Sequence, residues 1–166
     1  MLTAEEHLDN LVRHIELVRE AGLLLGKRLM RRGEEEFGRL LIARVFVHDA
    51  TKFYGAEWKY LHVGKDVPPD KLELAVTQHR ETNQHHPEYW GGLQRMPDIA
   101  VAEMVCDWYA RAQEFGTGLR DWIGGPATER FQIDKDSQQS QWIRKFVDLL
   151  LEDHFGREES RPPPRG

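Results

Sequence analysis

Seven histidine and aspartate residues in this sequence are of types that bind divalent metal ions, and they fall at five places along the chain. They are His14, His48, Asp49, His79, His85, His86 and Asp107. Imidazole and carboxylate donors suit Fe, Mn, Co, Ni or Zn, and carboxylate with water suits Mg or Mn. Ligands that converge from different helices leave coordination positions open for water and substrate. We therefore expect one or two divalent ions, with Fe or Mn favoured and Co, Ni, Zn or Mg as alternatives.

The adjacent pair His48-Asp49 is the starting point of this prediction. Its aspartate is suited to bridging two metals, or to binding one metal from the side opposite the histidine. Neighbouring residues of a helix point about 100° apart. The pair can still converge at the end of a helix, because the second residue need not keep helical geometry. The dipeptide alone is a weak indicator, so the prediction depends on the order of the whole set.

Several of these residues have simpler alternative roles. Asp107 could pair with Arg111 one helical turn later, and His79 could be a hydrogen-bonded histidine of the core. One or both of His85 and His86 should face the metal, since their side chains diverge if the segment is extended. Glu57 and Glu103 are expected beside the ligands or at the surface, and Trp90 and Trp108 in the core.

Helical periodicity places these donors on a small number of elements. Leu72 and Ala75 are expected on the apolar face of the helix that carries His79, and Leu150 and Leu151 on the core face of the last helix. The pattern Thr3-x-x-Glu6 is typical of a helix start, and Pro97 and Gly116 are suited to the two ends of another helix. The segment 80–95 is expected to be an ordered loop, and 117–136 to contain turns, most clearly at Gly124-Gly125-Pro126. The expected helices cover about 3–32, 34–48, 55–62, 69–79, 97–115 and 137–155. The fold prediction is an all-α bundle of five to seven helices with a central metal site.

Composition restricts the function classes. The 166 residues fit a single domain, expected over 1–156, and the Pro-rich tail 157–166 is expected to be disordered. A net charge of -5 without a long basic run argues against binding a nucleic-acid polymer. The single cysteine, Cys106, excludes an intrachain disulfide and a cysteine-based zinc site. No apolar stretch is long enough for a membrane span and the N-terminus does not resemble a signal peptide, so a cytoplasmic location is expected.

The order of the donors resembles that of the HD-domain superfamily, whose minimal metal set is H…HD…D with extra histidines where two metals bind. The segment HIELV at 14–18 resembles the first-helix motif H-x-x-x-V of that superfamily. HDATK at 48–52 resembles HD-x-x-K, in which the lysine faces the phosphate of the substrate in many members. HHPEYWGG at 85–92 resembles part of the HD-GYP branch, but the GYP tripeptide is absent, so a cyclic dinucleotide is not expected.

A closer resemblance is to an uncharacterised family found in bacteria and their phages. It is carried by HDATKF at 48–53, His79, NQHHPEYW at 83–90 and EMVCDW at 103–108. The similarity covers roughly residues 10 to 145, which is most of the chain. This resemblance implies an HD-like fold and carries no established reaction.

The leading functional expectation is metal-dependent phosphohydrolysis of a phosphate ester or nucleotide, in which metal-bound hydroxide attacks phosphorus. Asp49 would bridge the metals and Lys52 would offset charge on the phosphoryl oxygens. Arg80 and Asn83 flank the histidines and are expected either to contact substrate or to cap the loop. The expected partner is a small phosphorylated molecule such as a nucleotide. No association with a membrane is expected, and a homodimer is compatible with the sequence.

Two alternatives remain open at this point. Some HD-type relatives use a mixed-valent di-iron pair to activate dioxygen, and the histidine-rich donor set is compatible with that chemistry. A non-catalytic HD-like binding module is the other alternative. Loss of the HD pair or of the distal aspartate is the usual mark of such modules, and both are present here as His48-Asp49 and Asp107.

Overall fold

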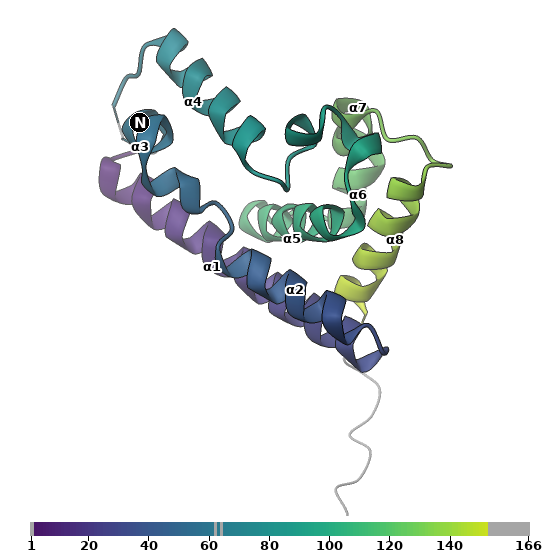
Figure 1. Ribbon diagram of the computed structural model, residues 1–166. Coiled ribbons are helices and arrows are strands. Elements are labelled where there is room, and N and C mark those ends of the chain that lie inside the picture. Colours follow the sequence, from purple (N-terminus) through teal and green to yellow (C-terminus); the bar gives the residue numbers. More distant parts are fainter. Residues whose placement is uncertain (1, 62, 64, 153–166) are drawn as a thin grey trace, which may run out of the picture.

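A computed structural model of the chain describes residues 2–61, 63 and 65–152. In this part of the chain every regular element is helical and there is no strand, which confirms the predicted all-α class (Figure 1). The predicted disordered tail at 157–166, together with His62 and His154, lies outside the described residues. None of the described helices combines the length and the apolar character needed to cross a membrane.

Five helices of the described part have 12 or more residues, and shorter turns connect them. The α-helices are α1 (Ala4–Arg31), α2 (Glu35–Phe46), α3 (Gly55–Tyr60), α4 (Pro69–Thr82), α5 (Asp98–Phe115), α6 (Leu119–Trp122), α7 (Thr128–Phe131) and α8 (Gln138–Leu151). The 3-10 helices are η1 (Ala50–Phe53), η2 (Pro87–Trp90) and η3 (Leu93–Arg95), and η4 (Ile123–Ala127) is a π-helix.

Helices α1 and α2 form an antiparallel pair, and Figure 1 shows α2 running back along the C-terminal half of α1. The predicted capping box of Thr3 and Glu6 begins α1. The two helices approach closely at Gly26 and Gly38, where a Cβ on Gly26 would lie 2.8 Å from the carbonyl oxygen of Gly38. This close crossing sets how α2 lies against α1, and His48 and Asp49 follow shortly after the end of α2.

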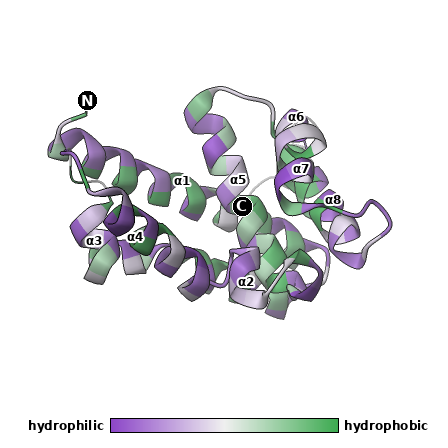
Figure 2. Ribbon diagram, turned by 90° about the horizontal axis from the view of Figure 1, so that it is seen from above, coloured by the Kyte–Doolittle hydropathy of each residue, from purple (hydrophilic) through white to green (hydrophobic). Residues whose placement is uncertain are grey.

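Helix α5 lies in the middle of the molecule and packs against α1, α2 and α8. It is buried on most sides, as residues such as Val101, Val105 and Ala110 show, and Trp108 is buried as expected. Figure 2, coloured by hydropathy, shows hydrophobic and hydrophilic residues alternating along the helices, most clearly along α1. Since α5 also carries Glu103 and Asp107, the central helix brings two carboxylates into the core.

Three sequence-based expectations about the elements are wrong. Gly124-Gly125-Pro126 lies inside the π-helix η4 and does not form a turn, because a wide helical turn accommodates the proline ring that clashes in an α-helix. Leu72, expected on the buried face of α4, is 43% exposed, and Ala75 alone is buried on that helix. Leu151, expected on the core face of α8, is at the surface.

Candidate metal centre

The pair His48-Asp49 lies in the turn between α2 and η1. Helix α2 ends at Phe46, and Asp49 adopts left-handed backbone angles, with φ of 56° and ψ of 18°. Asp is one of the few residues with a side chain that adopts this conformation readily. The reversal turns the Asp49 carboxylate back toward its neighbour, and Oδ2 lies 3.6 Å from His48 Nε2. The two side chains converge at the end of a helix, as the sequence analysis required.

The two carboxylate oxygens of Asp49 face different histidines. Oδ2 lies 3.9 Å from His14 Nε2, in addition to its contact with His48. Oδ1 lies 3.5 Å from His79 Nε2 and 3.4 Å from His85 Nε2. Asp49 is 2% exposed, so this arrangement is enclosed by protein. Each oxygen of this buried carboxylate thus faces a different pair of histidines.

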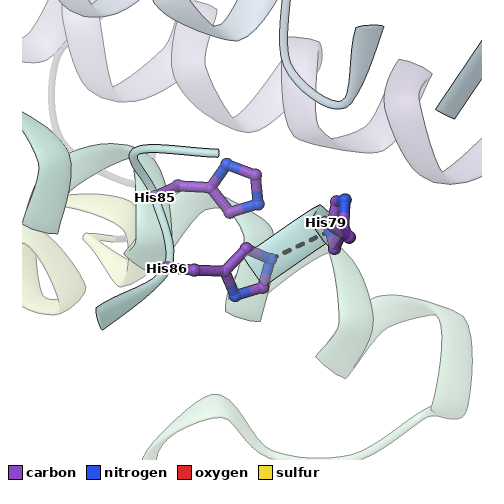
Figure 3. Close-up of side chains that lie close together, drawn as sticks. All are labelled: His79, His85 and His86. Carbon is purple, nitrogen blue, oxygen red and sulfur yellow. Dashed lines mark hydrogen bonds between the residues drawn. The ribbon is translucent and has the colours of Figure 1, made fainter. Parts of the chain in front are cut away.

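Donor atoms gather on both sides of Asp49. On one side, the donors of His14, His48 and Asp49 lie within 4.8 Å of one another, and Asp107 Oδ1 is 3.0 Å from His14 Nε2. On the other side are His79, His85 and His86, whose donors also lie within 4.8 Å of one another. Figure 3 shows His79 on α4 facing the two histidines that precede η2, with His86 Nε2 3.0 Å from His79 Nε2. All seven predicted ligands are therefore brought together.

A glutamate lies behind each of three of these imidazole rings, on the Nδ1 side. The pairs are Glu114 Oε1 with His14 at 3.2 Å, Glu103 Oε1 with His48 at 3.1 Å, and Glu57 Oε2 with His79 at 2.7 Å. A carboxylate accepts a hydrogen bond from Nδ1–H and so keeps the proton on that nitrogen. Nε2 is then unprotonated and free to bind a metal, which is how metal-binding histidines are usually oriented. Glu57 and Glu103 are buried beside the ligands.

Glu114 was not singled out by the sequence. It follows Asp107 by two turns of α5, so both carboxylates lie on the face of that helix that meets His14. This spacing was the available signal. Arg111, the alternative partner of Asp107, pairs with Glu114 at 2.9 Å.

Five buried donor atoms of the centre have no hydrogen-bond partner among the described residues. They are Nε2 of His14, His48 and His85, and Oδ1 of Asp49 and Asp107. Buried polar atoms are normally bonded, and leaving them unpaired is costly. A divalent cation between these atoms would satisfy them, so the donor set fits a metal.

The protonation states also suit metal binding. Burial lowers the pKa of His79 to about 3 and that of His86 to about 2, so both rings are neutral at pH 7. Burial opposes ionisation of Asp49, but His48 and Lys52 outweigh it and hold the pKa of the carboxyl well below its usual value. Lys52 Nζ lies 2.7 Å from Asp49 Oδ2. Burial also opposes ionisation of His48, but the carboxylates of Asp49 and Glu103 outweigh it and raise the pKa of that ring. His79 and His86 are thus neutral and Asp49 is ionised, which are the forms that bind cations.

A cavity of about 370 Å³ opens onto one side of the centre. Its lining includes Asp49, Asp107 and the three histidines of the second group, and also Lys52 and Arg80. Asn83 lies elsewhere, beside a smaller cavity of about 160 Å³. Its amide donates to Thr51 Oγ1 and to the His79 carbonyl oxygen, each at 2.8 Å. Of the two roles expected for Asn83, this geometry is that of a cap.

Comparison with curated proteins and with solved structures finds no match to this chain. A family model matches residues 3–153, which include every donor of the centre and almost the whole described structure. The matched family has no known function, as expected from the resemblance to an uncharacterised family. The chain belongs to a family of unknown function, DUF5662.

Proposed function

We propose that this protein is a metal-dependent phosphohydrolase with two divalent ions. One ion would be held by His14, His48, Asp49 and Asp107, and the other by Asp49, His79, His85 and His86. The supporting observation is the carboxylate of Asp49, which lies between His14 and His48 on one side and His79 and His85 on the other. Nε2 of His14, His48 and His85 has no hydrogen-bond partner among the described residues. The order of these donors along the chain, which resembles that of HD-domain proteins, also supports the proposal.

Hydrolysis of a phosphate ester adds water to phosphorus and breaks the P–O ester bond, which yields an alcohol and phosphate. Divalent ions supply an activated water and polarise a phosphoryl oxygen in such reactions. Among the described residues, no serine or cysteine lines the cavity, and Thr117 is the one hydroxyl side chain in its lining. Direct attack by water needs no nucleophilic side chain. Lys52 lines the cavity beside Asp49, where its ammonium group would offset negative charge on the phosphoryl oxygens.

Elemental analysis of protein purified without chelator tests the metal content directly. We expect about two transition-metal ions per chain, and phosphate release from nucleotides in a screen with Mn, Co, Fe and Mg. His48→Ala and Asp49→Ala should lose metal and keep the helical circular dichroism spectrum. His7→Ala, on the same helix as His14 but outside the donor set, is the control. Full metal content in both site variants would show that the ligand assignment is wrong.

A mixed-valent di-iron oxygenase is the second candidate, and the donor set favours it specifically. Five imidazoles and two carboxylates form a nitrogen-rich set that suits iron. Iron in the purified protein, a dioxygen-dependent change in its absorption spectrum and no phosphate release from any nucleotide would replace the hydrolase by the oxygenase. Protein with no more than a trace of metal would favour the non-catalytic binding module.

A further inference from the structure

The wall of the cavity away from the metal ligands is aromatic. It contains Trp108 and Phe115 of α5, Trp122 of α6 and Phe131 of α7. The rings of Trp108 and Phe131 stack, with centroids 5.5 Å apart and planes 22° apart. Two of the four rings come from the α6–η4–α7 segment, which folds back against α5. The cavity thus has a metal-binding end and an aromatic wall.

The charges that line the cavity are mostly positive, although the chain carries a net charge of -5. Lys52, Arg80, Arg111 and Arg130 are among the lining residues. Among the described residues, the carboxylates in that lining are Asp49 and Asp107, which both belong to the proposed ligand set. The guanidinium of Arg130 lies over the Phe131 ring, 4.8 Å from its centroid. A ligand of this cavity should therefore be an anion.

We infer that the cavity selects a phosphate ester carrying a flat aromatic ring, such as a nucleobase, with the ring against Trp108, Trp122 and Phe131. This inference rests on the proposed function for the position of the phosphate, which would lie toward Lys52 and the metal ligands. Aromatic side chains stack on any nucleobase, because every base has a flat π-face. The volume of about 370 Å³ is within the range of about 300–1,000 Å³ typical of small-ligand sites.

An aliphatic phosphate would use only one end of this cavity. Its phosphate would reach Lys52 and the metal ligands, while the aromatic wall would stay in contact with water. An aromatic ester covers that wall and removes its apolar surface from water. The α6–η4–α7 segment is thus the part of the chain that determines specificity, through Trp122 and Phe131.

Calorimetric titration of the full chain tests this inference with three probes: adenosine monophosphate, ribose 5-phosphate and adenosine. With Mn²⁺ present, the nucleotide should bind about tenfold more tightly than ribose 5-phosphate. Phe131→Leu should lower the affinity for the nucleotide and for adenosine about tenfold and leave the affinity for ribose 5-phosphate unchanged. Trp142→Leu is the matched control, because Trp142 is a half-buried aromatic of α8 that packs on the same core and does not line the cavity.

Adenosine titrated into chelator-treated protein examines the aromatic wall without phosphate or metal. If adenosine binds and Phe131→Leu abolishes this binding, the inference is supported. If no Mn²⁺-dependent phosphate release is found in the same protein, the proposed hydrolase is refuted while the inference stands. Equal affinity for the nucleotide and ribose 5-phosphate, with Phe131→Leu weakening both alike, would overturn the inference even if both are hydrolysed. Trp122→Leu gives the second reading if Phe131→Leu fails to fold.

Discussion

The glutamates behind the histidines determine which nitrogen of each ring faces the centre. Glu103 is held in turn by Arg44, whose Nε lies 2.8 Å from its Oε2. Burial opposes ionisation of Glu103, but its hydrogen bonds with His48 and His85 outweigh this and lower the pKa of the carboxyl. An ionised glutamate keeps the Nδ1 proton on its own side of the ring. The tautomer needed for metal binding is therefore set before any metal arrives.

Replacing a single glutamate should weaken the binding of one of the two proposed ions. Glu114→Gln removes the carboxylate behind His14, and Glu57→Gln removes the one behind His79. Each should lower the affinity for the corresponding ion about 10- to 100-fold, because a neutral amide orients the ring less strongly. Competition with a chromophoric chelator measures the two binding steps. Glu36→Gln, at an exposed position on α2, should change neither step. Unchanged affinities in both site variants would contradict this role.

Residue types and their order predicted which side chains come together, since all seven gather in one place. Their supporting glutamates were harder to predict. Glu114 is one of many acidic residues on helices, and its partner His14 lies on another helix far away in the sequence. Asn83 was equally consistent with two roles, and only the tertiary contacts with Thr51 distinguish them. Side-chain partners across elements depend on the packing of helices, which a sequence pattern does not specify.

Helix ends were predicted where their signals are local. Thr3 and Ser137 cap α1 and α8 with their side chains, and Gly116 ends α5 in the left-handed conformation. The segment after α5 was not predictable in this way. Ala127 of η4 is completely buried, so tertiary packing holds a helical turn where Gly124-Gly125-Pro126 alone favours a break. Local sequence signals predict a helix end where hydrogen bonds within the same segment determine it, and they fail where tertiary packing determines it.

The crossing of α1 and α2 should be sensitive to a single methyl group. A Cβ on Gly38 would clash with the carbonyl oxygen of Gly26 and lie 2.7 Å from Met30 Cγ. Gly38→Ala should therefore destabilise the fold by about 1–3 kcal/mol, as overpacking usually does. Gly124→Ala is the control, because a Cβ there meets no atom within 4 Å. Urea unfolding measures both, and equal stability of the two variants would show that the helices do not depend on this contact.

Forced separation of these helices would also move the turn that follows α2. That turn holds Asp49, whose Oδ2 faces the ring of His14 on α1. A wider crossing would lengthen this distance, so Gly38→Ala should lower metal affinity as well as stability. The geometry of the centre is thus a property of how two elements pack.

At the scale of the whole molecule, a buried group of titratable residues makes stability depend on pH. In the metal-free protein, burial holds the pKa of His79 near 3 and of His86 near 2, against an ordinary value of 6.5. Below that value the unfolded chain binds protons that the folded chain does not, so stability falls as pH decreases. The lowered pKa values of Asp49 and Asp107 act in the same direction below about pH 4.

We therefore expect the metal-free protein to lose unfolding free energy steadily from pH 7 to pH 4. The raised pKa values of His48 and Glu57 oppose this trend. We expect the large downward shifts of His79 and His86, together with the lowered pKa of Glu103, to outweigh them. Urea unfolding in the presence of a chelator, at several pH values, measures the slope. The double variant His79→Gln/His86→Gln should show a shallower slope. A stability that rises on acidification would contradict the burial of neutral rings.

Metal binding should tie together parts of the molecule that otherwise pack loosely. The proposed ligands come from α1, the turn after α2, the end of α4, the segment before η2, and α5. Helix α4 buries only Ala75, so it has little apolar packing to hold it in place. A free metal concentration one hundred times the Kd would stabilise the fold by about 2.7 kcal/mol per ion. For a chain of this size that corresponds to a rise in Tm of roughly 5–10 °C.

The stabilisation should be local as well as global. Hydrogen exchange of α4 amides should slow when Mn²⁺ is added, because His79 joins that helix to Asp49 through the ion. Amides of α8, which supplies no ligand, should change only through global unfolding. His48→Ala should remove both the rise in Tm and the protection of α4. Equal protection of α4 and α8 by Mn²⁺ would mean that the ion binds elsewhere, since only a centre that includes His79 links α4 to the core.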